Sequence, residues 1–333
     1  MKKEFIMSRN KTMALASGVS AACLLLGAPG AQAAAYTIKI GVAANFYSTV
    51  LEIISKYKAY HAGDGNTYTF TTTSDSTGNL RNAILAGGTA TTAPYDLFLS
   101  ADTAAPNAVS TLGMVVSGVT ETPFFYATGS LVLAAQTTDI ASCPTPGAGA
   151  SCGLPTTGSS IYTNFVIADP SRAPYGAAAR TVINQAPWSL GLSTATTFTY
   201  PPATFPASYV NTQANIGLTF YAVNNVTPPT YAYGFVAKSQ VCKNGALGSA
   251  SGGVFKITKA FEYVYNGASS PNFGHTATTA QTYSKIVQNG LPIERQQSAA
   301  LKTVVIDFKN YILGGGDGQG TTLRTKYCYG VTP

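Results

Sequence analysis

The amino-acid sequence predicts an α/β fold built mainly from parallel strands with helices between them. Continuously apolar runs recur along the chain, and such runs are typical of strands buried on both faces of a sheet. They occupy residues 36–45, 68–74, 95–102, 129–135, 164–169, 230–239 and 260–267. Strands that alternate with helical patterns indicate an α/β architecture.

Three stretches between these runs have the apolar spacing of a helix. The first follows Asn45 and carries Val50, Leu51, Ile54 and Tyr57. The second begins after Gly78 and carries Leu80, Ala83 and Ile84. The last has an apolar stripe of Leu301, Val304, Val305, Phe308 and Ile312. The Gly- and Pro-rich stretches at 143–158, 186–208 and 245–253 are expected to be loops.

Residues 1–33 are predicted to be a secretory signal peptide. Basic residues lead, a short apolar run follows, and Ala31-Gln32-Ala33 provides the small residues of a cleavage site. The apolar run is too short and too interrupted for a membrane anchor. We therefore expect a periplasmic or secreted protein after removal of the signal.

The charges of the chain argue against nucleic acid as a partner. Loss of the signal peptide lowers the formal net charge from +7 to +4, and no cluster of Lys and Arg remains. Only 10% of all residues are charged. The approximately 300 residues that remain are enough for one large or two medium domains.

Four cysteines follow the signal peptide, and an oxidising compartment favours two disulfides. Cys143 and Cys152 enclose a Gly- and Pro-rich loop, which leaves Cys242 and Cys328 to pair over a long span. A metal site is the alternative, but His61 and His275 lie near no cysteine in the sequence. We expect neither a metal nor a cofactor.

Three strand-to-helix turns share one architecture. Asn45 precedes the first helix, Ser76 and Thr77 precede the second, and the segment 174–176 follows the strand that ends at Asp169. A helix N-terminus offers unpaired N–H groups to an anion, although Asn, Ser and Thr are also ordinary helix caps. Three such turns at the carboxyl ends of parallel strands predict a ligand site there.

The order of several segments resembles the periplasmic molybdate-binding proteins of ABC importers. The segments are VAANFYSTVLEIISKY, TTSDSTGNLRNAILAGG, APYDLFLSAD, GSLVLAA and IADPSRAPYGAAA. The resemblance covers most of residues 36–330, with insertions near 137–160, 186–210, 243–256 and 266–295.

This resemblance implies a two-lobed periplasmic-binding-protein fold of type II, with a hinge of two crossing strands near Gly129 and Ala237. Lobe one would hold residues 36–128 and 260–333, and lobe two residues 129–259. The protein would be a monomer that closes over a small oxyanion, molybdate or tungstate, and delivers it to a membrane permease.

The resemblance also implies a set of ligand-binding residues. Asn45 takes the place of a serine in the first turn, and Ser76 and Thr77 take the place of a serine pair. Ile216 would donate its backbone N–H. Tyr175 stands where the family has alanine, and Phe235 stands where it has a tyrosine, with Tyr233 two residues away.

Tyr175 and Phe235 change the number of hydrogen-bond donors and the size of the site, so the same fold with phosphate, sulfate or a small organic anion is the alternative. Two further contacts remain open on sequence grounds. Arg172 lies in the turn itself, and it either contacts a ligand or only forms part of the turn. Asp75 either selects a protonated anion or caps its turn. Arg81 is expected on a solvated helix face.

The sequence gives little support to an enzyme. The two histidines that follow the signal peptide lack partners in the sequence, and neither a G-x-S-x-G nor an H-E-x-x-H motif occurs. The remaining alternative is a secreted interaction or adhesion protein that uses the binding-protein fold, which the long inserted loops would suit.

Overall fold

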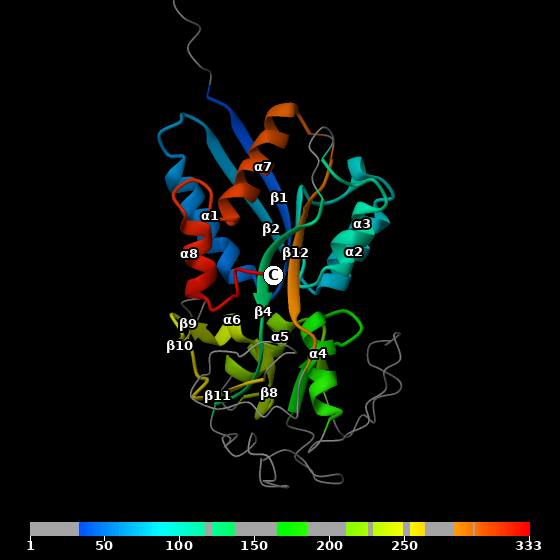
Figure 1. Ribbon diagram of the computed structural model, residues 1–333, viewed down its shortest axis with the longest axis vertical. Coiled ribbons are helices and arrows are strands. Elements are labelled where there is room, and N and C mark those ends of the chain that lie inside the picture. Colours follow the sequence, from blue (N-terminus) through cyan, green and yellow to red (C-terminus); the bar gives the residue numbers. More distant parts are fainter. Residues whose placement is uncertain are drawn as a thin grey trace, which may run out of the picture. The chain divides into compact units, whose positions relative to one another are not determined.

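Two five-stranded sheets organise the chain, and most helices pack on their faces (Figure 1). The computed structural model describes residues 33–116, 122–136, 165–185, 211–225, 229–248, 254–263, 283–295 and 297–333. The predicted signal peptide up to residue 32 and the predicted Cys143–Cys152 bridge lie outside these residues. Within the described part of the chain, no helix is long and apolar enough to span a bilayer.

Sheet one has the strand order β2-β1-β3-β12-β4. Its strands are β1 (Ala35–Ala43), β2 (Thr67–Asp75), β3 (Leu97–Leu99), β4 (Phe124–Gly129) and β12 (Ile286–Pro292). Strand β1 is parallel to β2 and β3, whereas β12 is antiparallel to β3 and β4.

Sheet two has the order β11-β5-β8-β6-β7. Its strands are β5 (Leu131–Ala135), β6 (Phe165–Ala168), β7 (Asn211–Gln213), β8 (Tyr233–Ala237) and β11 (Lys259–Glu262). Strand β6 is parallel to β7 and β8, and β5 is antiparallel to β8 and β11. The predicted α/β class is confirmed, but both sheets are mixed rather than mainly parallel.

The antiparallel pairings involve the strands on either side of two crossings between the sheets. Strand β4 ends at Gly129 and β5 begins at Leu131, so the first crossing lies where the sequence predicted it. The second lies between β11 and β12. The predicted crossing near Ala237 is wrong, because Ala237 ends β8 and α6 (Lys238–Val241) follows it.

We call each sheet with the helices that pack on it a lobe. Strand β11 belongs to sheet two, whereas residues from 260 onward were expected in lobe one. An apolar run predicts a strand but not the sheet that it joins. The lobe boundaries remain a prediction, because residues 34–333 form one compact unit.

Lobe one buries an apolar core on each face of its sheet, which explains the continuously apolar runs (Figure 1). The helices of one face are α1 (Tyr47–Tyr60), α7 (Ala299–Ile312) and α8 (Gln319–Lys326). Those of the other face are α2 (Thr77–Ala86) and α3 (Ala104–Ser110). The short helix η1 (Ala90–Thr92) follows α2. In α1 the buried side chains are Val50, Ile53, Ile54 and Tyr57. Leu51, which was predicted on the apolar face, is 41% exposed. The helical period places Ile53 on the buried face instead.

Lobe two repeats this arrangement with fewer helices. Helix α4 (Pro174–Ile183) packs on one face of sheet two and α5 (Ile216–Asn224) on the other. After α6 a hairpin of β9 (Cys242–Lys243) and β10 (Ala246–Leu247) turns through Asn244 and Gly245, both with positive φ.

The predicted disulfide between Cys242 and Cys328 is present. It joins β9, which follows α6 of lobe two, to Cys328, two residues beyond the end of α8 of lobe one, with the two Cα atoms 6.0 Å apart. Beside it, the Asn244 N–H donates to the Lys326 carbonyl at 2.7 Å. The two lobes are thus joined covalently at a point other than the strand crossings.

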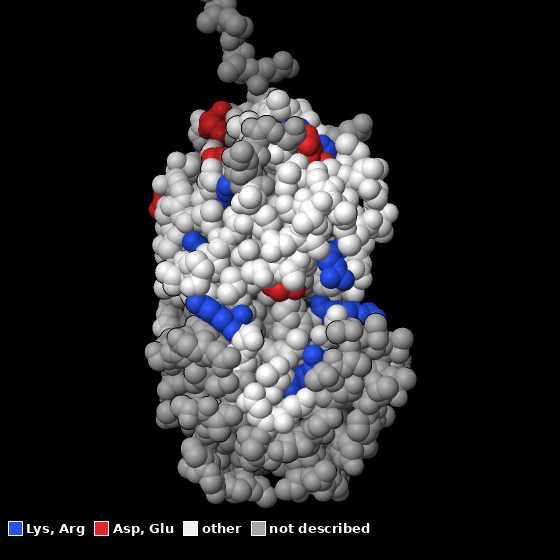
Figure 2. Space-filling view, turned by 45° about the vertical axis from the view of Figure 1, so that its right-hand side comes forward, with Lys and Arg blue, Asp and Glu red and all other residues white. Residues whose placement is uncertain are grey.

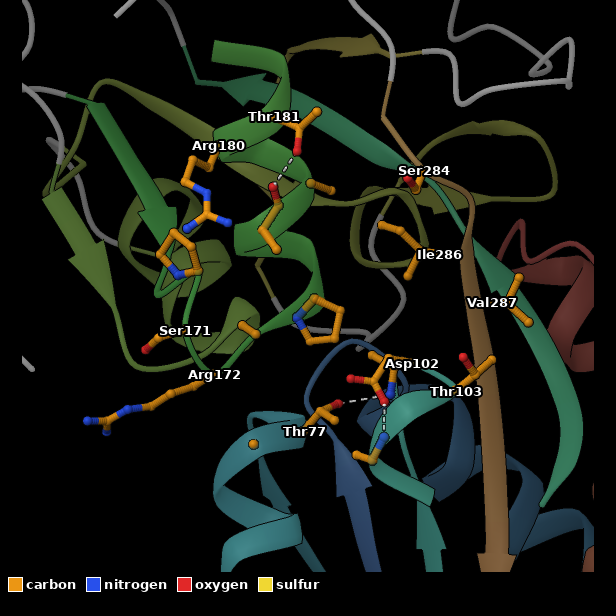
Figure 3. Close-up of a pocket in the computed structure, with 18 of the residues that line it drawn as sticks. Thr77, Asp102, Thr103, Ser171, Arg172, Arg180, Thr181, Ser284, Ile286 and Val287 are labelled. Carbon is orange, nitrogen blue, oxygen red and sulfur yellow. Dashed lines mark hydrogen bonds between the residues drawn. The ribbon is translucent and has the colours of Figure 1, made fainter. Parts of the chain in front are cut away.

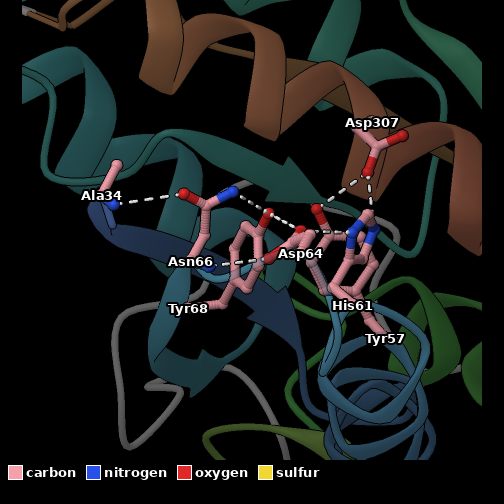
Figure 4. A network of polar contacts seen from close by, with 7 residues as sticks. All are labelled: Ala34, Tyr57, His61, Asp64, Asn66, Tyr68 and Asp307. Carbon is pink, nitrogen blue, oxygen red and sulfur yellow. Dashed lines mark hydrogen bonds and ion pairs between the residues drawn. The ribbon is translucent and has the colours of Figure 1, made fainter. Parts of the chain in front are cut away.

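A polar network closes the far end of lobe one, where α1 meets β2 (Figure 4). The Asp64 carboxylate accepts a hydrogen bond from the Tyr68 hydroxyl at 2.6 Å and another from the Asn66 N–H at 2.8 Å. These bonds lower the pKa of Asp64 to about 2. Because they favour the charged form, the stabilisation is complete above the unfolded pKa of about 4 and is lost as the pH falls towards 2.

Replacing Asp64 with Asn is therefore expected to reduce the loss in the free energy of unfolding as the pH falls from 5 to 2. Between pH 5 and pH 2 the wild type loses stability through this carboxylate, whereas the Asn side chain does not titrate. Urea unfolding midpoints at pH 5 and pH 2.5 measure the difference. Equal acid losses in both proteins would contradict the assigned role of Asp64.

Candidate functional site

Asn45 lies at the carboxyl end of β1, buried between the lobes. Its side-chain amide donates to Gln288 Oε1 at 2.9 Å and to the Tyr329 hydroxyl at 3.2 Å. It does not cap α1, whose capping position is Phe46. Since both amide hydrogens are donated within the protein, Asn45 has no side-chain hydrogen left for an anion.

Gln288 on β12 joins the two lobes at the centre of the cleft. Its Oε1 accepts from Asn45 and from the Tyr126 hydroxyl at 3.1 Å, and its Nε2 donates to the Tyr175 hydroxyl at 3.0 Å. We call these four residues the Gln288 bridge. Burial raises the pKa of Tyr126 and of Tyr175 well above the ordinary value, so both phenols stay neutral.

The bridge depends on a glycine at the end of β4. A Cβ atom on Gly129 would lie 1.9 Å from the Tyr175 hydroxyl and 2.5 Å from Gln288 Nε2. Any larger residue at this crossing point would displace both side chains. Tyr175, at the start of α4, therefore fills the place where the resemblance implied a small methyl group.

Ser76 and Thr77 have different roles. Ser76 caps α2, because its hydroxyl accepts from the Asn79 N–H at 3.3 Å. Thr77 Oγ1 accepts from the Ala101 N–H at 2.9 Å and thereby fixes α2 to the turn after β3. Both side chains are buried, but Thr77 alone of the two lines a cavity.

Asp75 acts as a cap and as a link between the lobes. Its Oδ1 accepts from the Ser76 N–H at 2.6 Å and from Asn79 Nδ2 at 3.2 Å. The same oxygen accepts from Asn215 Nδ2 of lobe two at 3.2 Å. The Asp75 carboxylate is thus engaged with amides of its own turn and of lobe two.

Gly78 allows the lobes to approach closely. Its N–H donates to the Arg172 carbonyl at 2.9 Å, and a Cβ atom at this position would lie 3.0 Å from the Arg172 Cα. The backbone that approaches the turn after β2 is therefore the DPSRAPYG turn of lobe two.

Arg172 lies in that turn, and its Nε is 3.4 Å from Asp169 Oδ2. The Asp169 carboxylate also accepts from the Ser171 N–H at 2.9 Å and from its hydroxyl at 2.7 Å. Arg172 is about one-third exposed, so its charge is only partly neutralised and remains at the mouth of the cleft. Arg81 donates to the neighbouring Asn82, on its own helix, and also lines the cleft.

Two predicted residues contribute no side chain to this region, and the role predicted for the Ile216 backbone N–H stays a prediction. The ring of Phe235 is fully buried in lobe two, where it packs against Phe165 and Tyr263 at centroid distances of 5.7 and 5.2 Å. Ile216 begins α5, and its carbonyl accepts from Gln240 Nε2 at 3.2 Å. Neither side chain lines the two cavities described next.

Among the described residues, three cavities lie between the lobes, and two of them contain residues that the sequence predicted for ligand binding. These two have no lining residue in common. Cavity A has a volume of about 490 Å³ and is lined by α2 and the start of α3, by residues 170–181 of lobe two, and by residues 284–287. Cavity B, of about 370 Å³, is lined by residues around Asn45, by Ser74 and by the start of α5. The Gln288 bridge adjoins both cavities, since Asn45 of the bridge lines cavity B and Val287, next to Gln288 in the chain, lines cavity A.

Cavity A combines basic groups, hydroxyls and apolar surface (Figure 3). Thr77 and Asp102 lie on the lobe-one side, and Ser171, Arg180 and Thr181 face them from lobe two (Figure 3). Its four basic residues are Arg81, Arg172, Arg180 and Lys285. Figure 2 shows Lys and Arg side chains gathered on either side of a hollow in this face of the molecule. Partial burial lowers the pKa of Arg180, which remains a cation at neutral pH.

Among the described residues, Asp102 is the one carboxylate that lines cavity A. Its Oδ1 accepts from the Ala105 N–H at 2.9 Å and from the Ser100 hydroxyl at 3.0 Å, so that it holds the first turn of α3. Among the described residues, no group of three or more His, Cys, Asp and Glu side chains is placed to hold a metal ion.

Sequence reasoning missed Gln288. It lies in the segment IVQNGLP, where a polar residue between apolar ones follows the strand period, but the resemblance treats this region as an insertion. The feature that identifies Gln288 as part of the site is its complete burial, which only the folded chain reveals.

The chain matches the profile of a protein family described as bacterial extracellular solute-binding protein, over residues 38–288. It is 31% identical over 224 residues to the molybdate-binding protein ModA of Azotobacter vinelandii, which covers 67% of this chain and 72% of that protein.

Two solved structures share the fold. One is the substrate-binding protein of an ABC transporter from Agrobacterium tumefaciens, with a TM-score of 0.54, 10% identity and coverage of 92% of this chain and 81% of that one. The other is the sulfate-binding protein SubI of Mycobacterium tuberculosis, with a TM-score of 0.51, 11% identity and coverage of 88% and 86%. The fold is the type II periplasmic-binding-protein fold. The chain belongs to the family of bacterial extracellular solute-binding proteins and is a binding protein, not an enzyme.

Proposed function

We propose that the protein is a periplasmic or secreted receptor that captures an anion between its two lobes and delivers it to the permease of an ABC importer. The observation that carries this proposal is cavity A, where four basic residues and five hydroxyl side chains meet between the lobes. Solute-binding proteins of this fold hold ligands at the carboxyl ends of parallel strands, which is where cavity A lies.

A tetrahedral oxyanion of the molybdate or tungstate type is the first candidate ligand. The 31% identity to a molybdate-binding protein supports it. The Thr77 hydroxyl supports it as well. Its oxygen accepts from the Ala101 N–H, which leaves the hydroxyl hydrogen to be donated to a ligand. Thr77 also begins α2, whose positive end favours a negative charge.

An altered ligand, such as phosphate, sulfate or a small organic anion, is the second candidate. The observation that favours it is the Gln288 bridge, since the Asn45 side-chain amide donates to Gln288 and the Tyr175 hydroxyl accepts from Gln288. Two of the side chains that the resemblance assigns to the ligand are engaged with each other through this glutamine.

Thermal melting in the presence of anions tests the proposed function. A ligand at 100 times its dissociation constant adds about 2.7 kcal/mol to the free energy of unfolding. We expect at least one of molybdate, tungstate, sulfate, phosphate or a small organic acid to raise the melting temperature. If none does, the receptor function is wrong and the interaction or adhesion alternative takes its place.

Replacing Thr77 with Val is expected to abolish the shift produced by the bound anion. It also leaves the Ala101 N–H buried without an acceptor, which costs about 1–3 kcal/mol of stability. Thr77→Ser keeps the hydroxyl and is the matched control. The ligand-induced shift, measured for each variant against its own ligand-free melting temperature, separates the two effects. An undiminished shift in the Val variant would place the ligand elsewhere.

A further inference from the structure

The centre of the cleft is filled by side chains of the protein itself. Asn45, Tyr175 and Gln288 are each at most 3% exposed, and their polar atoms are joined at 2.9 and 3.0 Å. A tetrahedral anion that sat among them would have to break these bonds and displace the Tyr175 ring. The structure therefore leaves an anion the space beside the bridge and not the space within it.

Cavity A is large for an inorganic anion. Its volume of about 490 Å³ falls within the range of about 300–1,000 Å³ that is typical of sites for organic ligands. Apolar side chains line cavity A beside its basic and hydroxyl groups, among them Ala105, Pro174, Ala178, Ile286 and Val287. Such a surface gains from contact with a carbon skeleton, which an inorganic oxyanion lacks.

The basic groups of cavity A come from separate elements. Arg81 lies on α2, Arg172 in the turn before α4, Arg180 on α4 and Lys285 in the crossing segment before β12. The basic groups thus reach the cavity from several elements, and a molecule with acidic groups at two positions can pair with more than one of them. Asp102 repels an acidic group at its own side of the cavity, so the acidic groups face Arg172, Arg180 and Lys285.

We propose that the ligand is an organic acid with at least two acidic groups, carboxylate or phosphate, bound in cavity A beside the Gln288 bridge. This inference rests on the proposed receptor function and names its substrate class. Under this proposal Gln288 and Tyr175 determine the specificity of the receptor, because they exclude a tetrahedral oxyanion from the centre of the cleft.

Isothermal titration calorimetry on the purified protein tests the ligand class. The probes are citrate, succinate and 3-phosphoglycerate as polyacids, lactate as a monoacid, and molybdate, sulfate and phosphate as inorganic anions. At least one polyacid is expected to bind about tenfold or more tightly than every inorganic anion, as one additional charge-assisted hydrogen bond would produce. Tightest binding by molybdate or sulfate would overturn the inference and leave the receptor function intact. Failure of all probes would overturn both.

Charge variants test the location. Arg172→Gln and Arg180→Gln are each expected to weaken polyacid binding about tenfold or more. Lys58→Gln removes one positive charge from the last turn of α1, outside the cavity lining, and is the matched control. Equal, small losses in all three variants would show that the protein responds to net charge alone, which would overturn the assignment to cavity A.

Two variants test the exclusion of oxyanions. Tyr175→Ala and Gln288→Ala each open the centre of the cleft and are expected to raise the affinity for molybdate or sulfate about tenfold or more. Melting curves establish that each variant is folded, and the two substitutions break the bridge independently. Folded variants that gain no affinity for either oxyanion would overturn the role given to the bridge.

Discussion

Replacing Lys238 with Ala is expected to lower the free energy of unfolding by about 3–5 kcal/mol, which is the usual cost of removing one partner of a buried ion pair. Lys238 Nζ lies 2.7 Å from Glu262 Oε2, and the two side chains are 5% and 0% exposed. The pair joins the start of α6 to β11 on the outer edge of sheet two. Its loss leaves the Glu262 carboxylate buried without this counter-ion.

A paired replacement is the matched control for this prediction. The double variant Lys238→Met, Glu262→Leu removes both charges together and is expected to be far more stable than either single variant, because no unpaired charge remains. Chemical unfolding of the wild type, Lys238→Met, Glu262→Leu and the double variant gives the coupling energy between the two residues. A loss below about 1 kcal/mol in the Lys238 variant would mean that water reaches the pair.

Loss of the disulfide between Cys242 and Cys328 is expected to lower stability by about 2–4 kcal/mol, since this cystine closes a long loop in the unfolded chain. The two residues are 86 positions apart, and the bond joins the strand after α6 of lobe two to the end of lobe one. Urea unfolding of the wild type and of the double variant Cys242→Ser, Cys328→Ser measures the effect.

Reduction provides the control for the disulfide. Dithiothreitol is expected to destabilise the wild type by an amount similar to that of the double Ser variant and to change the variant little. If reduction left the wild-type midpoint unchanged, the bond would contribute nothing to the stability of the folded protein.

The sequence was sufficient for the architecture because the fold depends on periodic burial. Apolar runs and helical spacing locate β1, α1, β2 and α2, and the Cys242–Cys328 pairing follows from the cysteine count and the compartment. The second crossing was misplaced because hydrophobic pattern reports burial but not the sheet to which a strand belongs. The same limit explains why β11 was expected in lobe one.

The candidate site was predicted less completely, for a different physical reason. Helix-start positions mark Thr77 as a residue at the cleft, and Thr77 lines cavity A. Whether Asn45 faces a ligand or another side chain depends on Gln288, which lies 243 residues further along the chain. Long-range side-chain pairing of this kind leaves no local pattern in the sequence.

Hydrogen–deuterium exchange of the purified protein, with and without a saturating anion identified by melting or calorimetry, tests the central claim most directly. If the ligand binds in cavity A, exchange should slow in residues 75–81 and 170–181, which line its two sides and are joined by the bond from the Gly78 N–H to the Arg172 carbonyl. Protection confined to other segments, or no protection at saturation, would contradict ligand capture between the lobes.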